Sequence, residues 1–141
     1  MKFSIGMVFV FVFVLITNNA FSQSEADLLG FQNMIKNIKL PIKKSENVSI
    51  VDIFMDGQKL TYVSVFSNKL AKATGNLSEA EIRKAFSSQI KEICLGTLDI
   101  RKQYNWLDVV HLHIDKSKKL LFKINSRDDC KKFDVPNFLQ S

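Results

Sequence analysis

Residues 48–66, with the sequence VSIVDIFMDGQKLTYVSVF, decide how this chain folds. The two runs 48–55 and 59–66 are rich in β-branched and aromatic residues, which pack well on the surface of a sheet. Between them stands Asp56-Gly57, and both residue types tolerate the positive φ angles that tight turns between antiparallel strands require. The stretch therefore predicts a β-hairpin near the middle of the chain.

A second hairpin is expected toward the C-terminus, with strands at 106–115 and 119–125 joined by the polar turn 116–118. Apolar and polar residues alternate in both runs, as they do in strands with one buried face. We expect the aliphatic side chains of the first strand to face the core, matched by apolar residues across the turn. The residues expected on that core face are Val110, Leu112, Ile114, Leu120, Phe122 and Ile124.

Two helices are expected, one before the first hairpin and one between the hairpins. Ser24 is a capping residue followed by acidic residues, and the helix that it begins should end before Pro41, because the residue preceding a proline avoids helical angles. Ser78 and Glu81 have the spacing of a capping box, which predicts a longer central helix ending near Gly96. The apolar stripe of this central helix consists of Ile82, Phe86, Ile90 and Ile93.

The order helix, hairpin, helix, hairpin predicts an α+β fold. The expected architecture is an antiparallel four-stranded sheet, made of the two β-hairpins and packed against the central helix, with the N-terminal helix added. Residues 42–47 are expected to form a loop, and residues 131–141 a loosely packed tail.

The first 22 residues have the three parts of a secretory signal. Lys2 supplies the positive start, residues 5–16 are an unbroken apolar stretch, and residues 20–22 (Ala-Phe-Ser) are the small-residue pattern before a cleavage point. A membrane-spanning helix needs about 20 apolar residues, whereas this stretch has 12. We therefore expect the signal to be removed without leaving a membrane anchor, and residues 23–141 to act as a single domain in the periplasm or outside the cell.

The two cysteines, Cys94 and Cys130, both lie in the expected exported domain. Thiols of exported proteins normally pair in an oxidising compartment. A redox-active pair would usually have the C-x-x-C spacing, but these cysteines are 36 positions apart. We therefore predict a structural disulfide rather than a redox centre.

Three segments carry a resemblance: Leu60-Thr61-Tyr62 in the first hairpin, the helix that reaches Cys94, and Asp128-Asp129-Cys130 after the last strand. In this layout the chain resembles small uncharacterised periplasmic proteins of Gram-negative bacteria, over about residues 48–130. The resemblance implies a location and an α+β fold, and it implies no activity.

His111, His113 and Asp115 are the candidate metal ligands of the sequence. Alternate residues of a strand share one face, so two imidazoles and a carboxylate would project together and could hold zinc with a position open for water. The alternative interpretation is a polar strand face, with Leu112 and Ile114 in the core. Phosphate-binding glycine loops, the G-x-S-x-G elbow and the H-E-x-x-H pair are absent from the sequence, so no catalytic residue and no cofactor is predicted.

The net charge of +6 falls to +5 when Lys2 leaves with the signal. Lysines form clusters at 43–44, 116–119 and 131–132, which either attract an anionic partner or simply keep the protein soluble. Lysine greatly outnumbers arginine, the usual residue for bidentate phosphate recognition, so no nucleic acid is expected. Tyr104 and Trp106 are candidate partner-binding residues, with the edge of the core as the alternative.

The small size, the expected disulfide and the lack of a catalytic motif favour a non-catalytic protein that binds a partner in the cell envelope. An inhibitor, an immunity-type factor and an accessory to a larger assembly all fit this description. A metal-assisted hydrolase using His111, His113 and Asp115 is the alternative, and a carrier of a small ligand held between sheet and helix is a third hypothesis. The sequence does not indicate an oligomeric state.

Overall fold

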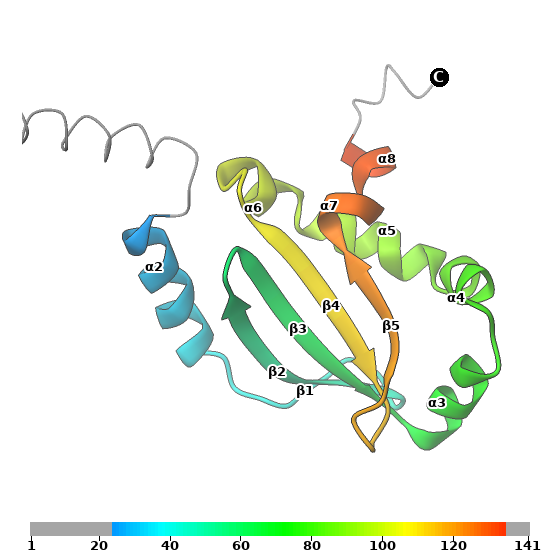
Figure 1. Cartoon of the computed structure of the whole chain (residues 1–141). Helices are drawn as coiled ribbons and strands as arrows, with labels where there is room; N and C mark the ends of the chain where they lie inside the picture. Colours follow the sequence, from blue (N-terminus) through cyan, green and yellow to red (C-terminus); the bar gives the residue numbers. More distant parts are fainter. Residues whose placement is uncertain (1–23, 135–141) are drawn as a thin grey trace, which may run out of the picture.

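The structure, a computed structural model, describes residues 24–134 and has an α+β architecture. Five strands form one sheet in the order β1-β2-β3-β4-β5 (Figure 1). The strands are β1 (Ile42–Lys43), β2 (Val48–Asp56), β3 (Lys59–Phe66), β4 (Asp108–Ile114) and β5 (Leu120–Asn125). The pair β3–β4 is parallel and the other neighbouring pairs are antiparallel, so the sheet is mixed.

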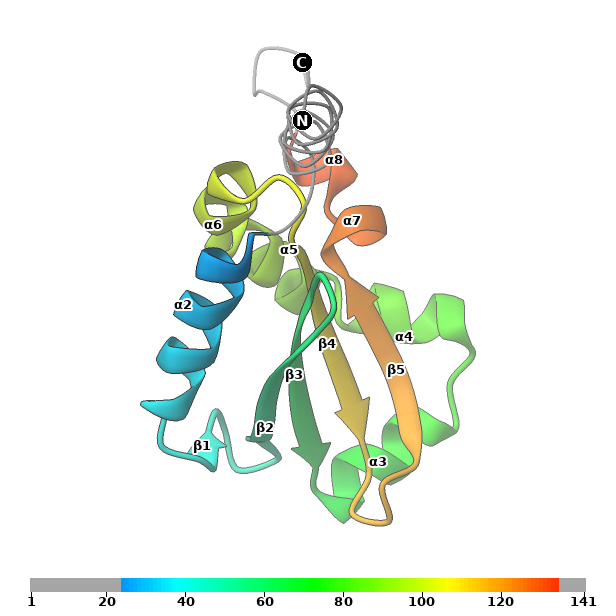
Figure 2. The ribbon, with the colours of Figure 1, turned by 60° about the vertical axis from the view of Figure 1, so that its left-hand side comes forward.

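The larger helices pack on one face of this sheet. In Figures 1 and 2, α2 stands to the left of the strands and α4 to their right. The described helices are α2 (Glu25–Lys36), α3 (Asn68–Gly75), α4 (Glu79–Ala85), α5 (Ser87–Gly96), α6 (Leu98–Gln103), α7 (Ser126–Asp129) and α8 (Lys131–Asp134). Among the helices within residues 24–134, none is long and apolar enough to cross a membrane. The predicted signal, residues 1–22, lies outside the described residues, and its removal stays a prediction.

The prediction of a four-stranded antiparallel sheet is wrong. Lys59 of β3 pairs with Asp108 of β4 in parallel register, so the two hairpins lie side by side in the same orientation. The reason is the connection between them, because residues 67–107 form helices that carry the chain back to the end of the sheet where β3 began. The fifth strand, β1, lies in the segment 42–47 that was expected to be a loop.

The first hairpin is confirmed, and its turn follows from the sequence. Asp56 pairs with Lys59, which leaves Gly57 and Gln58 as the two turn residues. Gly57 has a φ of 59°, and a positive φ at the first turn position is what a two-residue turn of type II′ requires.

The β4 side chains that face the core are not the ones that were predicted. His111 pairs with Ile124 and His113 pairs with Phe122, so both histidines face the core. Leu112 therefore points to the other face of the sheet, away from the helices. The prediction failed because it counted histidine as polar, whereas here each imidazole is stacked on an aromatic ring inside the fold.

The helix starts are as predicted, but two helical segments differ. Ser24 accepts a hydrogen bond from the backbone of Asp27, and Ser78 and Glu81 form the capping box. The central helix is broken at Phe86, where the backbone (φ −100°, ψ 17°) separates α4 from α5. The short helix α3 was not predicted, because Asn68–Gly75 is short and contains only one large apolar side chain, Leu70.

The core consists of two clusters on the helix-covered face. One joins α4 and α5 to the ends of β3 and β5 and contains Phe66, Ile82, Ile90, Cys94, Phe122, Ile124 and Cys130. The other joins α2 to β2, β3 and β4 and contains Phe31, Ile50, Ile53, Leu60, Leu107 and Val109. Because the first cluster fills the space between the sheet and the central helix, the ligand-carrier hypothesis loses the site that it assumed.

Residues 131–134 are not the loose tail that was expected. They form α8, whose Phe133 packs against the first core cluster. The rest of the expected tail, 135–141, lies outside the described residues.

Candidate functional site

The predicted disulfide between Cys94 and Cys130 is present. The Cα atoms of the two cysteines are 5.3 Å apart, and both residues are fully buried. The bond joins α5 to the end of α7, so it fixes the helical layer to the last strand of the sheet.

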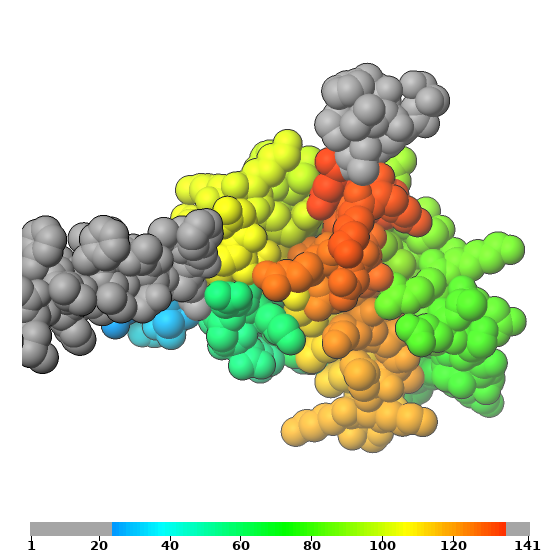
Figure 3. Space-filling model, turned by 45° about the horizontal axis from the view of Figure 1, so that its top comes forward, coloured from blue at the N-terminus to red at the C-terminus, as the bar shows by residue number. Residues whose placement is uncertain are grey.

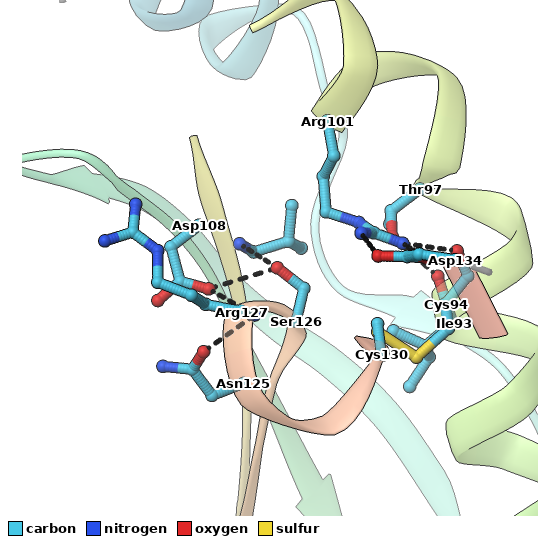
Figure 4. A network of polar contacts seen from close by, with 11 residues as sticks. Ile93, Cys94, Thr97, Arg101, Asp108, Asn125, Ser126, Arg127, Cys130 and Asp134 are labelled. Atoms are coloured by element: carbon cyan, nitrogen blue, oxygen red, sulfur yellow. Dashed lines mark hydrogen bonds and ion pairs between the residues drawn. A yellow bond between two sulfur atoms is a disulfide. The ribbon is translucent and has the colours of Figure 1, made fainter. Parts of the chain in front are cut away.

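Arg101 of α6 holds the same region together (Figure 4). Its guanidinium donates to both carboxylate oxygens of Asp134, at 2.6 and 3.0 Å, and to the carbonyl oxygen of Cys94 at 2.7 Å. A further bond reaches the hydroxyl of Thr97 at 3.0 Å. The contact with Asp134 attaches α8 to α6 and explains why this part of the chain is not loose.

A second polar group lies where β4 begins and β5 ends (Figure 4). The buried carboxylate of Asp108 accepts from the Ser126 hydroxyl at 3.0 Å and from the backbone of Arg127 at 3.1 Å. The Ser126 hydroxyl in turn accepts from the backbone N–H of Val109 at 2.8 Å. These bonds satisfy the buried groups and fix the geometry of the sheet edge, so we assign this network a structural role.

The candidate zinc ligands do not converge. His111 stacks on Tyr62 of β3 (ring centroids 4.8 Å apart), whereas His113 stacks on Phe122 of β5 (4.2 Å), so the two imidazoles lean toward opposite neighbours. Asp115 lies beyond the end of β4, where its carboxylate accepts from the backbone and hydroxyl of Ser117 and from the backbone of the turn.

Within residues 24–134 no group of three or more His, Cys, Asp or Glu side chains is placed to hold a metal ion. Zinc binding by His111, His113 and Asp115 stays a prediction, and their arrangement gives it no support.

The two histidines are nonetheless unusual. Burial, and to a lesser extent the nearby Lys44 ammonium, lowers the pKa of His111 from 6.5 to about 4. Burial lowers the pKa of His113 to about 4 as well, with a smaller contribution from His111. The buried atoms His111 Nε2 and His113 Nδ1 have no hydrogen-bond partner. Both imidazoles are therefore neutral at pH 7.

A hollow of about 530 Å³ lies between α2 and α6, and we call it the α2–α6 groove. Its apolar walls come from both helices, with Phe31 and Met34 on one side and Ile100 and Tyr104 on the other. The full lining is Ala26, Asp27, Gly30, Phe31, Met34, Asp99, Ile100, Gln103 and Tyr104.

Gly30 shapes this groove, because a Cβ atom built on it meets no atom within 4 Å. The lining includes two carboxylates, Asp27 on α2 and Asp99 on α6, and no basic residue. The groove therefore combines an apolar floor with an acidic border, on a protein that is basic as a whole.

The predicted partner-binding residues take two different positions. Tyr104 lines the groove, and its ring lies 5.0 Å from that of Phe31 in an edge-on arrangement. Trp106 packs on Phe31 from another side, with centroids 5.9 Å apart, and supports the wall without lining the groove. The sequence thus indicated one wall of the groove, and it missed the wall on α2, because only the tertiary fold brings α2 and α6 together.

The comparisons with known proteins concern the fold. No family model and no curated protein matches this chain. A Pseudomonas aeruginosa protein described as secreted has a similar structure, with a TM-score of 0.60 and 11% identity, over 78% of this chain and 100% of that one. EpsS, the pilotin of the Vibrio vulnificus type 2 secretion system, is similar with a TM-score of 0.50 and 13% identity, over 74% of this chain and 87% of its own.

At these identities the likeness shows a shared fold. The fold of this chain thus occurs in a secreted bacterial protein and in a component of a secretion system. This agrees with the α+β fold that the sequence resemblance implied, and it identifies neither an activity nor a ligand.

Proposed function

We propose that this protein is an exported, non-catalytic accessory protein that binds a protein partner of the cell envelope through the α2–α6 groove. The groove itself is the observation that carries the proposal, because it is an apolar surface hollow with charged borders between two helices. A pilotin is among the proteins that share the fold, which supports an accessory role in an envelope assembly. An inhibitor and an immunity-type factor belong to the same class of partner-binding protein.

Export is supported by two independent features. The first 22 residues have the pattern of a secretory signal, and the disulfide between Cys94 and Cys130 is of the kind that persists in oxidising compartments. We therefore place the working protein in the periplasm or outside the cell.

A non-catalytic role is supported by the structural tasks of the candidate catalytic groups. His111 and His113 are stacked inside the fold, and Asp115 organises the turn after β4. Asp129 accepts from the backbone of Asn125 at 2.7 Å and pairs with Arg83 at the same distance. Each of these groups is therefore engaged in holding the fold.

The chemistry of the groove defines the partner. An apolar floor between two helices suits the apolar face of an inserted helix or extended segment, which would bury side chains against Phe31 and Ile100. Among residues 24–134 neither Asp27 nor Asp99 forms an ion pair, so both are available to basic residues beside that face. We expect a partner segment with apolar residues flanked by Lys or Arg.

Substitution of Gly30 tests the proposal. Gly30 lines the groove and a Cβ atom built on it meets no atom within 4 Å, so Gly30→Leu should block the partner and leave folding intact. Gly96→Leu is the matched control, because Gly96 is also a helical glycine with open space around it, but it lies on α5 outside the groove. Affinity capture from envelope extract with the parent protein or with Gly96→Leu should recover a partner protein in a stoichiometric amount. Capture with Gly30→Leu should not recover it. Equal capture by all three would disprove binding in the groove.

A further inference from the structure

The positive charge of this protein gathers at one end of the sheet. We call this end the basic pole and define it by seven exposed lysines: Lys43, Lys44, Lys69, Lys72, Lys116, Lys118 and Lys119. They come from β1 and the residue after it, from α3, and from the β4–β5 turn, segments that are far apart in the sequence. All three segments lie at the lower end of the sheet in Figure 1.

The strand register brings these segments together. Lys43 pairs with Ser49 of β2, and Ser49 pairs with Val65 of β3. Val65 in turn pairs with Ile114 of β4, which immediately precedes the β4–β5 turn. Helix α3 starts directly after β3, so its lysines lie at the same end. The clustering is thus a property of the fold that the separate lysine clusters of the sequence did not reveal.

The basic pole carries the whole net charge of the expected exported chain. Residues 23–141 contain 19 basic and 14 acidic side chains, a net charge of +5. The basic pole has seven lysines and two acidic residues, Glu46 and Asp115, which is also +5. The remainder of the chain has 12 basic and 12 acidic side chains and is balanced. The charge distribution of the protein is therefore asymmetric, and the basic pole is the end that attracts anions.

Within residues 24–134 the ammonium groups of the basic pole form no ion pair. The three ion pairs among residues 24–134 are all made by arginines, and none of these seven lysines takes part in one. Arg83, Arg101 and Arg127 each also donate to a backbone carbonyl. The ion pairs of residues 24–134 are thus made by arginine, and the lysine charge at the basic pole is open to an external partner.

An exposed leucine accompanies the charge. Leu120 directly follows Lys118 and Lys119 and is 52% exposed. The turn that precedes it projects at the lower edge of the molecule in Figure 3. Basic residues around an exposed apolar side chain are the combination with which peripheral proteins bind a bilayer, the charge attracting anionic lipids and the apolar group entering the headgroup layer.

A shallow hollow of about 390 Å³ lies between α3 and this turn. Lys72, Lys116 and Lys119 line it, together with the Ser117 side chain. The Asp115 carboxylate in its wall is occupied by bonds from the turn, at 2.6 to 2.9 Å. The hollow therefore offers ammonium donors to the phosphate of a lipid headgroup.

We propose that the basic pole docks on a membrane surface of anionic phospholipid. The predominance of lysine favours an anionic membrane over an acidic protein as the partner. The lysine ammonium is a hydrated point charge suited to a diffuse charged surface, whereas directional recognition of carboxylates usually employs arginine. Helix α2 begins and α8 ends at the opposite end of the molecule from the basic pole (Figure 1). The α2–α6 groove is lined by α6, which lies at that same upper end in Figure 1, so a protein partner and a membrane can be bound together.

Vesicle sedimentation tests the proposal. The processed chain, expressed from its full-length gene and with its N-terminus checked by mass, is mixed with phosphatidylcholine vesicles with and without about 30% phosphatidylglycerol. Binding is expected only to the anionic vesicles and should weaken steeply with salt. Each lysine near an anionic surface contributes about a fivefold factor, so Lys116→Gln/Lys118→Gln/Lys119→Gln should weaken binding about a hundredfold.

The control separates the basic pole from the total charge. Lys84→Gln/Lys91→Gln/Lys102→Gln removes the same charge from exposed positions on α4, α5 and α6 and should change the affinity less than threefold. Leu120→Ser should weaken binding several-fold at every salt concentration. Equal losses in the two triple variants, or no binding to anionic vesicles at low salt, would overturn the proposal. Loss of an acidic protein from capture experiments by the first triple variant, without vesicle binding, would overturn it in favour of a protein partner.

Discussion

The stability of this protein should depend on pH between 7.5 and 5 because of His113. Its ring is 9% exposed and lies flat against Phe122, with centroids 4.2 Å apart. Burial lowers its pKa from 6.5 to about 4, so the unfolded chain binds a proton at a higher pH than the folded chain does. Stability that is fully present above pH 6.5 is therefore lost as the pH falls toward 4.

The size of the effect follows from the two pKa values. For a group that moves from 6.5 in the unfolded chain to about 4 in the fold, linkage gives a loss of about 2 kcal/mol between pH 7.5 and 5. His111 has the same shift and adds a similar loss. The pKa values of the Glu81 and Asp115 carboxylates are lowered in the fold. Their protonation begins to reduce the stability of the protein only below this pH range, so the histidines dominate in it.

The variant His113→Phe keeps an aromatic ring against Phe122 and removes the titrating group. Urea unfolding with the disulfide intact, followed by Trp106 fluorescence at pH 7.5 and pH 5, gives the free energy of unfolding at both values. The parent should lose about 4 kcal/mol over this range and the variant about 2 kcal/mol. A variant that loses as much stability as the parent would refute the reasoning that His113 is held neutral by burial.

Three further predictions concern the connections of the fold. Cys94→Ala/Cys130→Ala should reduce the free energy of unfolding by about 4 kcal/mol, because the bond closes a loop of 36 positions, and chemical denaturation of the double variant measures this; an unchanged midpoint would contradict it. Arg101→Lys should cost about 2 kcal/mol, since lysine cannot make the two parallel bonds to Asp134, and exposure of α8 to proteolysis should increase with it. Lys118→Gly should stabilise the protein by about 1 kcal/mol, since Lys118 has a φ of 69° that glycine adopts without strain; a lower melting temperature would count against this.

The elements of this fold were predictable where their signals are local. The turn at Gly57 and the capping box of Ser78 and Glu81 depend on residues a few positions apart, and both formed as expected. The parallel pairing of β3 with β4 was not predictable in this way. It depends on how the 41 residues of the connection, 67–107, pass over the sheet, and no short stretch of sequence encodes that path.

In the candidate site, too, some residues have a local signal in the sequence and others depend on the tertiary fold. Tyr104 stood out in the sequence as an aromatic residue near a strand start, and it lines the α2–α6 groove. Gly30 and Met34 gave no signal, because their importance arises only when α2 packs beside α6. The lysines of the basic pole were visible as separate clusters, but their convergence depends on the sheet register. His111 was misplaced because a neutral imidazole packs as an aromatic ring, and polarity scales do not express this.

Photo-crosslinking in cells tests most directly whether the α2–α6 groove binds a protein. A photoreactive residue at Met34, which is 40% exposed in the groove, is compared with one at Leu95, which is 52% exposed on α5 outside it. The account predicts one discrete protein adduct from position 34 that is absent from position 95 and that disappears when Gly30→Leu fills the groove. Identical adducts from both positions, or none from position 34, would contradict it.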